Sequence, residues 1–109
     1  MTGFSMRLPS LLLGGLILAA PAIAGQDHKV SQADKKFSVS DLTVNRGDSV
    51  TFANAEQLTV HNVSGKGAAS FNTGTQKPGE AKQVMMDQPG TMEVRCAIHP
   101  LMKMTVTVK

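Results

Sequence analysis

The last nineteen residues of the chain, TMEVRCAIHPLMKMTVTVK (91–109), contain two runs of alternating apolar and polar residues with a short loop between them. The apolar residues are Met92, Val94 and Cys96 before the loop, and Met104, Val106 and Val108 after it. Because side chains of a β-strand point alternately to opposite faces, this period predicts two strands that each bury one face. The tight loop of residues 97–101 joins them. Cys96 is therefore expected to point inward at the end of its strand, with His99 returning close to it.

Similar alternation extends back through the chain to Phe37. Apolar pairs occur at Phe37 and Val39, Leu42 and Val44, and Val50 and Phe52, and TVHNV (59–63) is typical of a further short strand. Turn-forming sequences separate these runs at 45–49 (NRGDS), 77–80 (KPGE) and 88–90 (QPG). Residues 64–70 (SGKGAAS) are expected to form a loop, and residues 25–35 a loose or edge segment. Short strands between turns, without a helical period after residue 24, predict an all-β antiparallel sandwich or barrel.

The first 24 residues differ in composition from the rest of the chain. One charged residue, Arg7, precedes the apolar run LPSLLLGGLILAAP (8–21), and small residues follow at Ala22 and Ala24. This order is typical of a secretory signal peptide, and the apolar run is short and glycine-broken for a membrane-spanning helix. We expect cleavage after Ala24, which leaves a single domain of residues 25–109 in the periplasm. An uncleaved N-terminal anchor is the alternative.

Charge and cysteine content exclude several classes of protein. The formal net charge is +3, and it is +2 without residues 1–24, where Arg7 is the one charged residue. A charge this small and evenly spread does not indicate nucleic-acid binding, and the chain has no Trp or Tyr for stacking on bases or sugars. The single cysteine cannot form an intramolecular disulfide. The domain must therefore be stabilised by its core or by a metal.

Cys96 and His99 place a thiolate and an imidazole in one loop, and a metal needs at least one more strong ligand. Of the other two histidines, His28 is expected to be a solvated residue of the N-terminal segment, and His61 lies within a predicted strand. Taken singly, Cys96 would be a buried thiol and His61 a core histidine. Together with a methionine, however, one thiolate and two imidazoles are the ligands of a blue copper site. Thiolate and thioether suit Cu(I) and imidazoles suit both oxidation states, so one copper ion per chain is predicted.

The sequence resembles the cupredoxins, the type 1 blue copper proteins, and most closely the amicyanin-like and plastocyanin-like members. The resemblance rests on NRGDSVTFAN (45–54), VHNV (60–63), KPGE (77–80) and PGTMEVRCAIHPLM (89–102). It implies a small Greek-key β-sandwich with copper at one end, held by His61, Cys96 and His99. It also implies that Asn62 ties the His61 segment to the cysteine loop.

Two positions depart from the family pattern. Met92 stands where many relatives carry tyrosine, and Ile98 stands where amicyanin and plastocyanin carry proline. Because isoleucine has a backbone N–H and proline has none, we expect the Ile98 amide to join the Asn62 amide in donating to the sulfur of Cys96. Such bonds would draw electron density from the sulfur and favour Cu(I).

Two methionines compete for the weak axial position. Met102 gives the short His-x2-Met spacing of amicyanin, whereas Met104 gives the His-x4-Met spacing of plastocyanin. Met102 is predicted to be axial because HPLM (99–102) matches the short loop and Met104 continues the core stripe of the last strand. Met104 is the alternative. The other methionines after residue 24 are expected to fill gaps in the core, with one of an adjacent pair turned outward: Met85, Met86 and Met92.

These expectations describe a periplasmic copper protein that carries single electrons between redox partners. Four protein ligands leave no open coordination site, so enzyme activity is not expected. The resemblance suggests a c-type cytochrome and a dehydrogenase as partners, docking on an apolar patch around His99 that includes Ala97, Pro100, Leu101 and residues 67–69. A monomer without stable membrane insertion after processing is expected. The alternative function is a periplasmic copper carrier or copper-sequestering protein that uses the same ligands.

Overall fold

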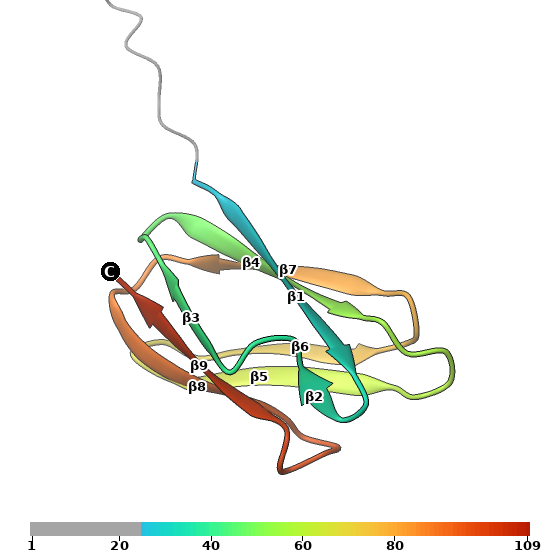
Figure 1. Ribbon diagram of the computed structural model, residues 1–109. Coiled ribbons are helices and arrows are strands. Elements are labelled where there is room, and N and C mark those ends of the chain that lie inside the picture. Colours follow the sequence, from blue (N-terminus) through green and yellow to red (C-terminus); the bar gives the residue numbers. More distant parts are fainter. Residues whose placement is uncertain (1–24) are drawn as a thin grey trace, which may run out of the picture.

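The computed structural model describes residues 25–109, which form nine β-strands and no helix (Figure 1). The strands are β1 (Asp27–Ala33), β2 (Lys36–Phe37), β3 (Asp41–Val44), β4 (Asp48–Asn54), β5 (His61–Gly67), β6 (Phe71–Gln76), β7 (Ala81–Met86), β8 (Gly90–Cys96) and β9 (Lys103–Val108). Among these residues no helix is long and apolar enough to cross a membrane. The predicted signal peptide, residues 1–24, lies outside the described part of the chain.

The strands form two sheets that pack face to face (Figure 1). One sheet has the order β2-β1-β4-β7 and the other the order β3-β9-β8-β5-β6. The chain passes between the sheets after β2, β3, β4, β6 and β7, as in Greek-key sandwiches. The core between them contains Val30, Phe37, Val44, Val50, Phe52, Val63, Met86, Met92, Val94, Cys96, Met102, Met104, Val106 and Val108. The predicted all-β sandwich is confirmed, but its sheets are mixed and not purely antiparallel, because β1 pairs with β4 and β3 with β9 in parallel.

The C-terminal strand pair forms as its alternation predicts. β8 and β9 are antiparallel neighbours, with Val94 opposite Met104 and both side chains buried. The connecting loop is closed by two backbone bonds, from Met102 N to His99 O (2.9 Å) and from Cys96 N to Met102 O (3.2 Å). Cys96 therefore ends β8 pointing inward, directly beside the loop that carries His99.

β1 shows that the expectation of a loose or edge segment at residues 25–35 is wrong. The strand lies inside its sheet, between β2 and β4, and pairs with β4 in parallel. Val30 and Gln32 point inward and are buried, and Nε2 of Gln32 donates to Oε1 of Gln76 over 3.2 Å. The alternation was hard to see in the sequence because a glutamine occupies an inward position where an apolar residue is usual.

His28 belongs to this strand and is not the solvated tail histidine that the sequence suggested. Its Nε2 lies 2.9 Å from Oδ2 of Asp48. Asp48 also accepts the backbone N–H groups of Gln26 (2.9 Å) and Asn45 (3.0 Å). These bonds, the one from His28 first, lower the pKa of Asp48 to about 2. Asp48 thereby ties the start of β1 to the turn before β4.

β5 extends farther than its glycine-rich sequence indicates. Residues 64–67, expected in a loop, continue the strand, and Gly65 lies opposite Phe71 of β6. A Cβ atom at position 65 would lie 2.3 Å from Cε2 of Phe71. The Phe71 ring covers the strand at this point and stacks on Phe52, with 5.8 Å between ring centroids. The glycine therefore makes room for an aromatic ring rather than marking a loop.

Candidate metal centre

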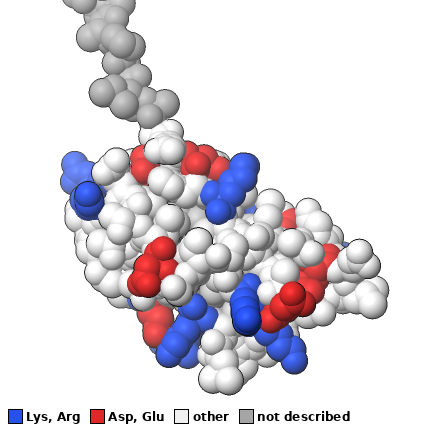
Figure 2. Space-filling model, in the orientation of Figure 1, with Lys and Arg blue, Asp and Glu red and all other residues white. Residues whose placement is uncertain are grey.

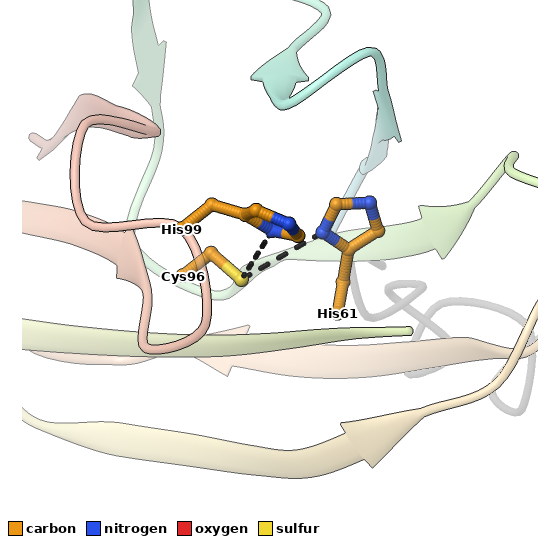
Figure 3. A group of neighbouring side chains, drawn as sticks. All are labelled: His61, Cys96 and His99. Atoms are coloured by element: carbon orange, nitrogen blue, oxygen red, sulfur yellow. Dashed lines mark hydrogen bonds between the residues drawn. The ribbon is translucent and has the colours of Figure 1, made fainter. Parts of the chain in front are cut away.

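Three side chains converge at one end of the five-stranded sheet (Figure 3). His61 begins β5 and Cys96 ends β8, and the two strands are antiparallel neighbours with Val63 opposite Cys96. His99 reaches the same place from the loop that follows β8. One potential ligand atom from each of the three residues lies within 4.8 Å of the others. The structure thus brings together the three strong ligands predicted from the sequence.

The sulfur of Cys96 faces both imidazoles. Its Sγ lies 3.7 Å from Nδ1 of His61 and 3.7 Å from Nδ1 of His99 (Figure 3). Zinc, a first-row metal like copper, makes bonds of about 2.3 Å to sulfur and about 2.0 Å to nitrogen, which separate two ligand atoms by about 3.5–3.8 Å at tetrahedral to trigonal angles. The spacing therefore fits a single metal ion, and a thiolate with two imidazoles suits copper or zinc.

The site is buried except where His99 approaches the surface. His61 and Cys96 are 0% and 1% exposed, whereas His99 is partly exposed. A shallow depression of about 220 Å³ lies beside His99. Its lining consists of Lys35, Ile98, His99, Pro100, Leu101 and Met102. The imidazole of His99 is accordingly the predicted ligand that lies nearest to solvent.

Both candidate axial methionines are buried, each 2% exposed. Met104 lies within β9 opposite Val94, in the core stripe between the sheets. Met102 precedes β9, and its backbone bonds to His99 and Cys96 close the loop. It also lines the depression beside His99. The backbone of Met102 thus bonds to two of the predicted strong ligands, Cys96 and His99, whereas Met104 packs in β9.

The two backbone amides expected to contact the cysteine sulfur behave differently. The Asn62 N–H donates to Sγ of Cys96 over 3.4 Å. The side-chain Oδ1 of Asn62 is buried without a hydrogen-bond partner among the described residues. The backbone N–H of Asn62, and not its side-chain oxygen, therefore links β5 to Cys96. Within residues 25–109 the Ile98 amide makes no bond to this sulfur, which corrects the expectation for that position. Ile98 lies on the outer part of the loop and is 45% exposed.

Glu56 also contacts the site, although the sequence did not indicate it. Its Oε2 lies 3.1 Å from Nε2 of His61. The hydrogen bond with His61 is the largest cause that lowers the pKa of Glu56, and the backbone amides of Asp34 and Lys35 lower it further. A buried histidine with one nitrogen directed at the metal needs a partner for the other. That requirement was the available signal, but it does not say which residue provides the partner.

Other expected positions are partly revised. Residues 67–69 do not join the surface around His99, because Gly67 lies opposite Met92 and Ala68 N donates to Thr91 O at the beginning of β8. They are therefore at the opposite end of that strand from Cys96. The methionine predictions are confirmed: Met86 and Met92 are buried at 1% and 2% exposure, and Met85 is turned outward at 56%.

Comparison with known proteins agrees with this geometry. Residues 24–109 match the copper binding proteins of the plastocyanin/azurin family. The chain is 32% identical over 94 residues to amicyanin of Paracoccus denitrificans, in a match that covers 84% of this chain and 72% of that protein.

Solved structures give the same result. A variant of amicyanin in its reduced state is 30% identical and superposes with a TM-score of 0.69, covering 84% of this chain and 89% of that chain. A Cu-containing nitrite reductase from Thermus scotoductus, at 23% identity and a TM-score of 0.73, is similar in fold, and the match covers 84% of this chain and 24% of that chain. This chain belongs to the plastocyanin/azurin family of copper-binding proteins, the cupredoxins, and its cofactor is copper.

Proposed function

We propose that this protein carries single electrons, using one copper ion held by His61, Cys96, His99 and Met102. The observation that supports the proposal best is the position of Cys96 Sγ, 3.7 Å from one Nδ1 atom of each histidine. A bound copper ion would supply one-electron exchange between Cu(I) and Cu(II). The ligands come from two paired strands and a closed loop, so they need little rearrangement between oxidation states.

Met102 is proposed as the weak axial ligand. Its buried side chain belongs to the loop that carries His99, and its backbone bonds to both His99 and Cys96. Because these two bonds close the loop, they keep Met102 close to His99 and Cys96. Met104, in contrast, fills the core opposite Val94.

Redox partners are proposed to dock on the surface around His99. Its apolar residues are exposed: Ala97, Ile98, Pro100 and Leu101. Among them, Leu101 is 94% exposed. A small apolar contact around a partly exposed ligand permits the weak, rapidly dissociating binding that a shuttle needs. A c-type cytochrome and a dehydrogenase are partners of the expected kind.

We also propose that the protein is a periplasmic monomer, exported by a signal peptide that is cleaved after Ala24. On the face drawn in Figure 2, charged side chains of both signs are interspersed, unlike the single-sign surface of a nucleic-acid-binding protein. Four protein ligands leave no open position at which a substrate would bind. The nitrite reductase of similar fold is an enzyme, so the argument for a carrier rests on the ligand set and not on the fold.

The visible absorption spectrum and cyclic voltammogram of the copper-loaded protein test this function. An intense band near the red end of the spectrum and a reversible one-electron wave are the expected results. Binding of Cu(I) alone, with ready transfer to an apo acceptor, would instead identify a copper carrier. A purified protein that binds no copper would rule out both functions.

A further inference from the structure

We propose that Glu56 orients His61 at the copper site and lowers the reduction potential of the copper through its negative charge. The inference rests on the proposed function, because it requires copper bound to His61. Oε2 of Glu56 lies 3.1 Å from Nε2 of His61, on the side of the ring away from Cys96. Glu56 itself is not part of the three-residue cluster whose ligand atoms converge, so it acts through the histidine.

The contact determines which nitrogen of His61 carries the proton. A carboxylate oxygen can only accept, so Nε2 must donate and therefore carries the hydrogen. Nδ1 then keeps its lone pair and faces Sγ of Cys96 at 3.7 Å. A neutral imidazole without such a partner can place its proton on either nitrogen. Glu56 thus selects the tautomer that binds metal through Nδ1 and also restrains rotation of the ring.

Glu56 is itself held in place by β4. Its backbone N–H donates to Oδ1 of Asn54 over 2.9 Å. The side-chain amide of Asn54, which is 2% exposed, donates to the carbonyl groups of Thr59 and Gln76, each over 2.9 Å. The segment of residues 55–60 is therefore clamped at both its beginning and its end. A carboxylate on a loop that is fixed at both ends can restrain the imidazole of His61, whereas a carboxylate on a mobile loop would move with the imidazole.

The charge of Glu56 lies where water screens it little. The side chain of Glu56 is 17% exposed and that of His61 is 0% exposed. A glutamate carboxyl group is ionised at neutral pH, and charges at partly buried positions interact more strongly than charges in water. Cu(II) carries one positive charge more than Cu(I), so a fixed negative charge behind the imidazole stabilises Cu(II) more. The potential is lower as a result.

Three substitutions separate the charge from the geometry. Glu56→Gln keeps an oxygen that can accept from Nε2–H but removes the charge, and Glu56→Ala removes both. Glu93→Gln is the matched control, because it removes the same charge from the outer face of β8. Glu93 pairs with Arg95 over 3.0 Å, and its side chain is 50% exposed.

Cyclic voltammetry measures the effect of the charge. Glu56→Gln is expected to shift the Cu(II)/Cu(I) equilibrium toward Cu(I) by about tenfold, or about 59 mV for a one-electron couple, with the blue band retained. Glu93→Gln is expected to shift it by much less. Glu56→Ala should reduce copper affinity by about 10–100-fold, as loss of such partners does at other metal sites.

NMR of the apo-protein measures the tautomer without copper. In the wild type and in Glu56→Gln, the His61 ring should show a proton on Nε2, and in Glu56→Ala a mixture of both tautomers. If Glu56→Ala does not fold, the potential and the NMR spectrum of Glu56→Gln still decide.

An unchanged potential in Glu56→Gln, or an equal shift in Glu93→Gln, would overturn the charge effect and leave the copper function standing. A wild-type ring with its proton on Nδ1 would overturn the positioning role. A wild-type protein that shows no blue band would overturn the proposed function, and this inference with it.

Discussion

The backbone N–H of Asn62 donates a hydrogen bond to Sγ of Cys96 across 3.4 Å. Asn62 follows the proposed ligand His61 at the beginning of β5, and Cys96 is the last residue of β8. The bond therefore joins the two strands at the metal centre itself. Because the strands are in register over five residue pairs from Val63–Cys96 onward, the sheet as well as the loop determines where the sulfur lies.

Replacing Cys96 with serine should abolish the blue band while the fold survives. The serine hydroxyl is a hard and poorly ionised donor, so it cannot provide the thiolate that a blue copper site requires. Visible absorption after addition of Cu(II), with far-ultraviolet circular dichroism as the control for folding, checks the result. A wild-type visible band in Cys96→Ser would disprove the assignment of this ligand.

Met102→Gln and Met104→Gln should affect different properties, the first the reduction potential and the second the stability of the fold. Glutamine at the axial position provides a harder oxygen donor, so Met102→Gln should retain copper and lower the reduction potential. Glutamine at 104 would place an amide in the core opposite Val94, which costs about 1–3 kcal/mol of stability. Voltammetry and thermal unfolding of both variants decide, and a change of potential that follows Met104 alone would reverse the assignment.

Ile98→Pro should leave the reduction potential unchanged. The sequence suggested a decrease, on the expectation that the Ile98 amide bonds to the cysteine sulfur. In the structure the Asn62 amide makes such a bond and the Ile98 amide does not, so removal of the latter has no direct effect on the sulfur. Voltammetry gives the reduction potentials of Ile98→Pro, which lacks the N–H, and of Ile98→Ala, which keeps it, and the two potentials should be equal. A lower potential in the proline variant alone would show that the amide reaches the sulfur once copper is bound.

Asp48→Asn should destabilise the protein at neutral pH and flatten its response to acid. The pKa of Asp48 is about 2 in the folded chain, below the value of about 3.9 in unfolded chains. A carboxyl group of this kind stabilises the fold above about pH 4, and the stabilisation is lost as pH falls toward about 2. Thermal unfolding of the apo-protein between about pH 4 and about pH 2 measures this loss of stability. Asp41→Asn, on the exposed side of β3, is the control, and identical acid profiles in all three proteins would contradict the expectation.

Gly65→Ala should destabilise the fold, because its Cβ would lie 2.3 Å from Cε2 of Phe71. Overpacking of this kind typically costs about 1–3 kcal/mol. Urea unfolding of the single variant and of Gly65→Ala with Phe71→Leu tests the cause. The double variant should recover the loss that comes from the clash, and an equal cost in the presence and absence of the ring would point to backbone effects instead.

The sequence predicted the features that depend on local order. Alternation in residues 91–109 correctly predicted β8, β9 and the inward direction of Cys96, and the spacing from Cys96 to His99 predicted that both would meet in one loop. His61 was selected because it lies within a predicted strand, whereas His28 was expected in the N-terminal segment, and the family resemblance supports the same choice. These inferences succeed because strand periodicity and loop length act on residues that are neighbours along the chain.

Residue type and spacing were enough to predict the β-structure of the chain and the three side chains, His61, Cys96 and His99, that meet at the candidate metal centre. Only the tertiary structure showed that β1 lies inside a sheet, that Gly65 accommodates Phe71, and that Glu56 contacts His61. The first two depend on sheet order and on the register between strands, and the third on how the loop after β4 folds over the histidine. Such contacts join groups whose distance is set by packing of the whole sandwich, so neither alternation nor spacing specifies them.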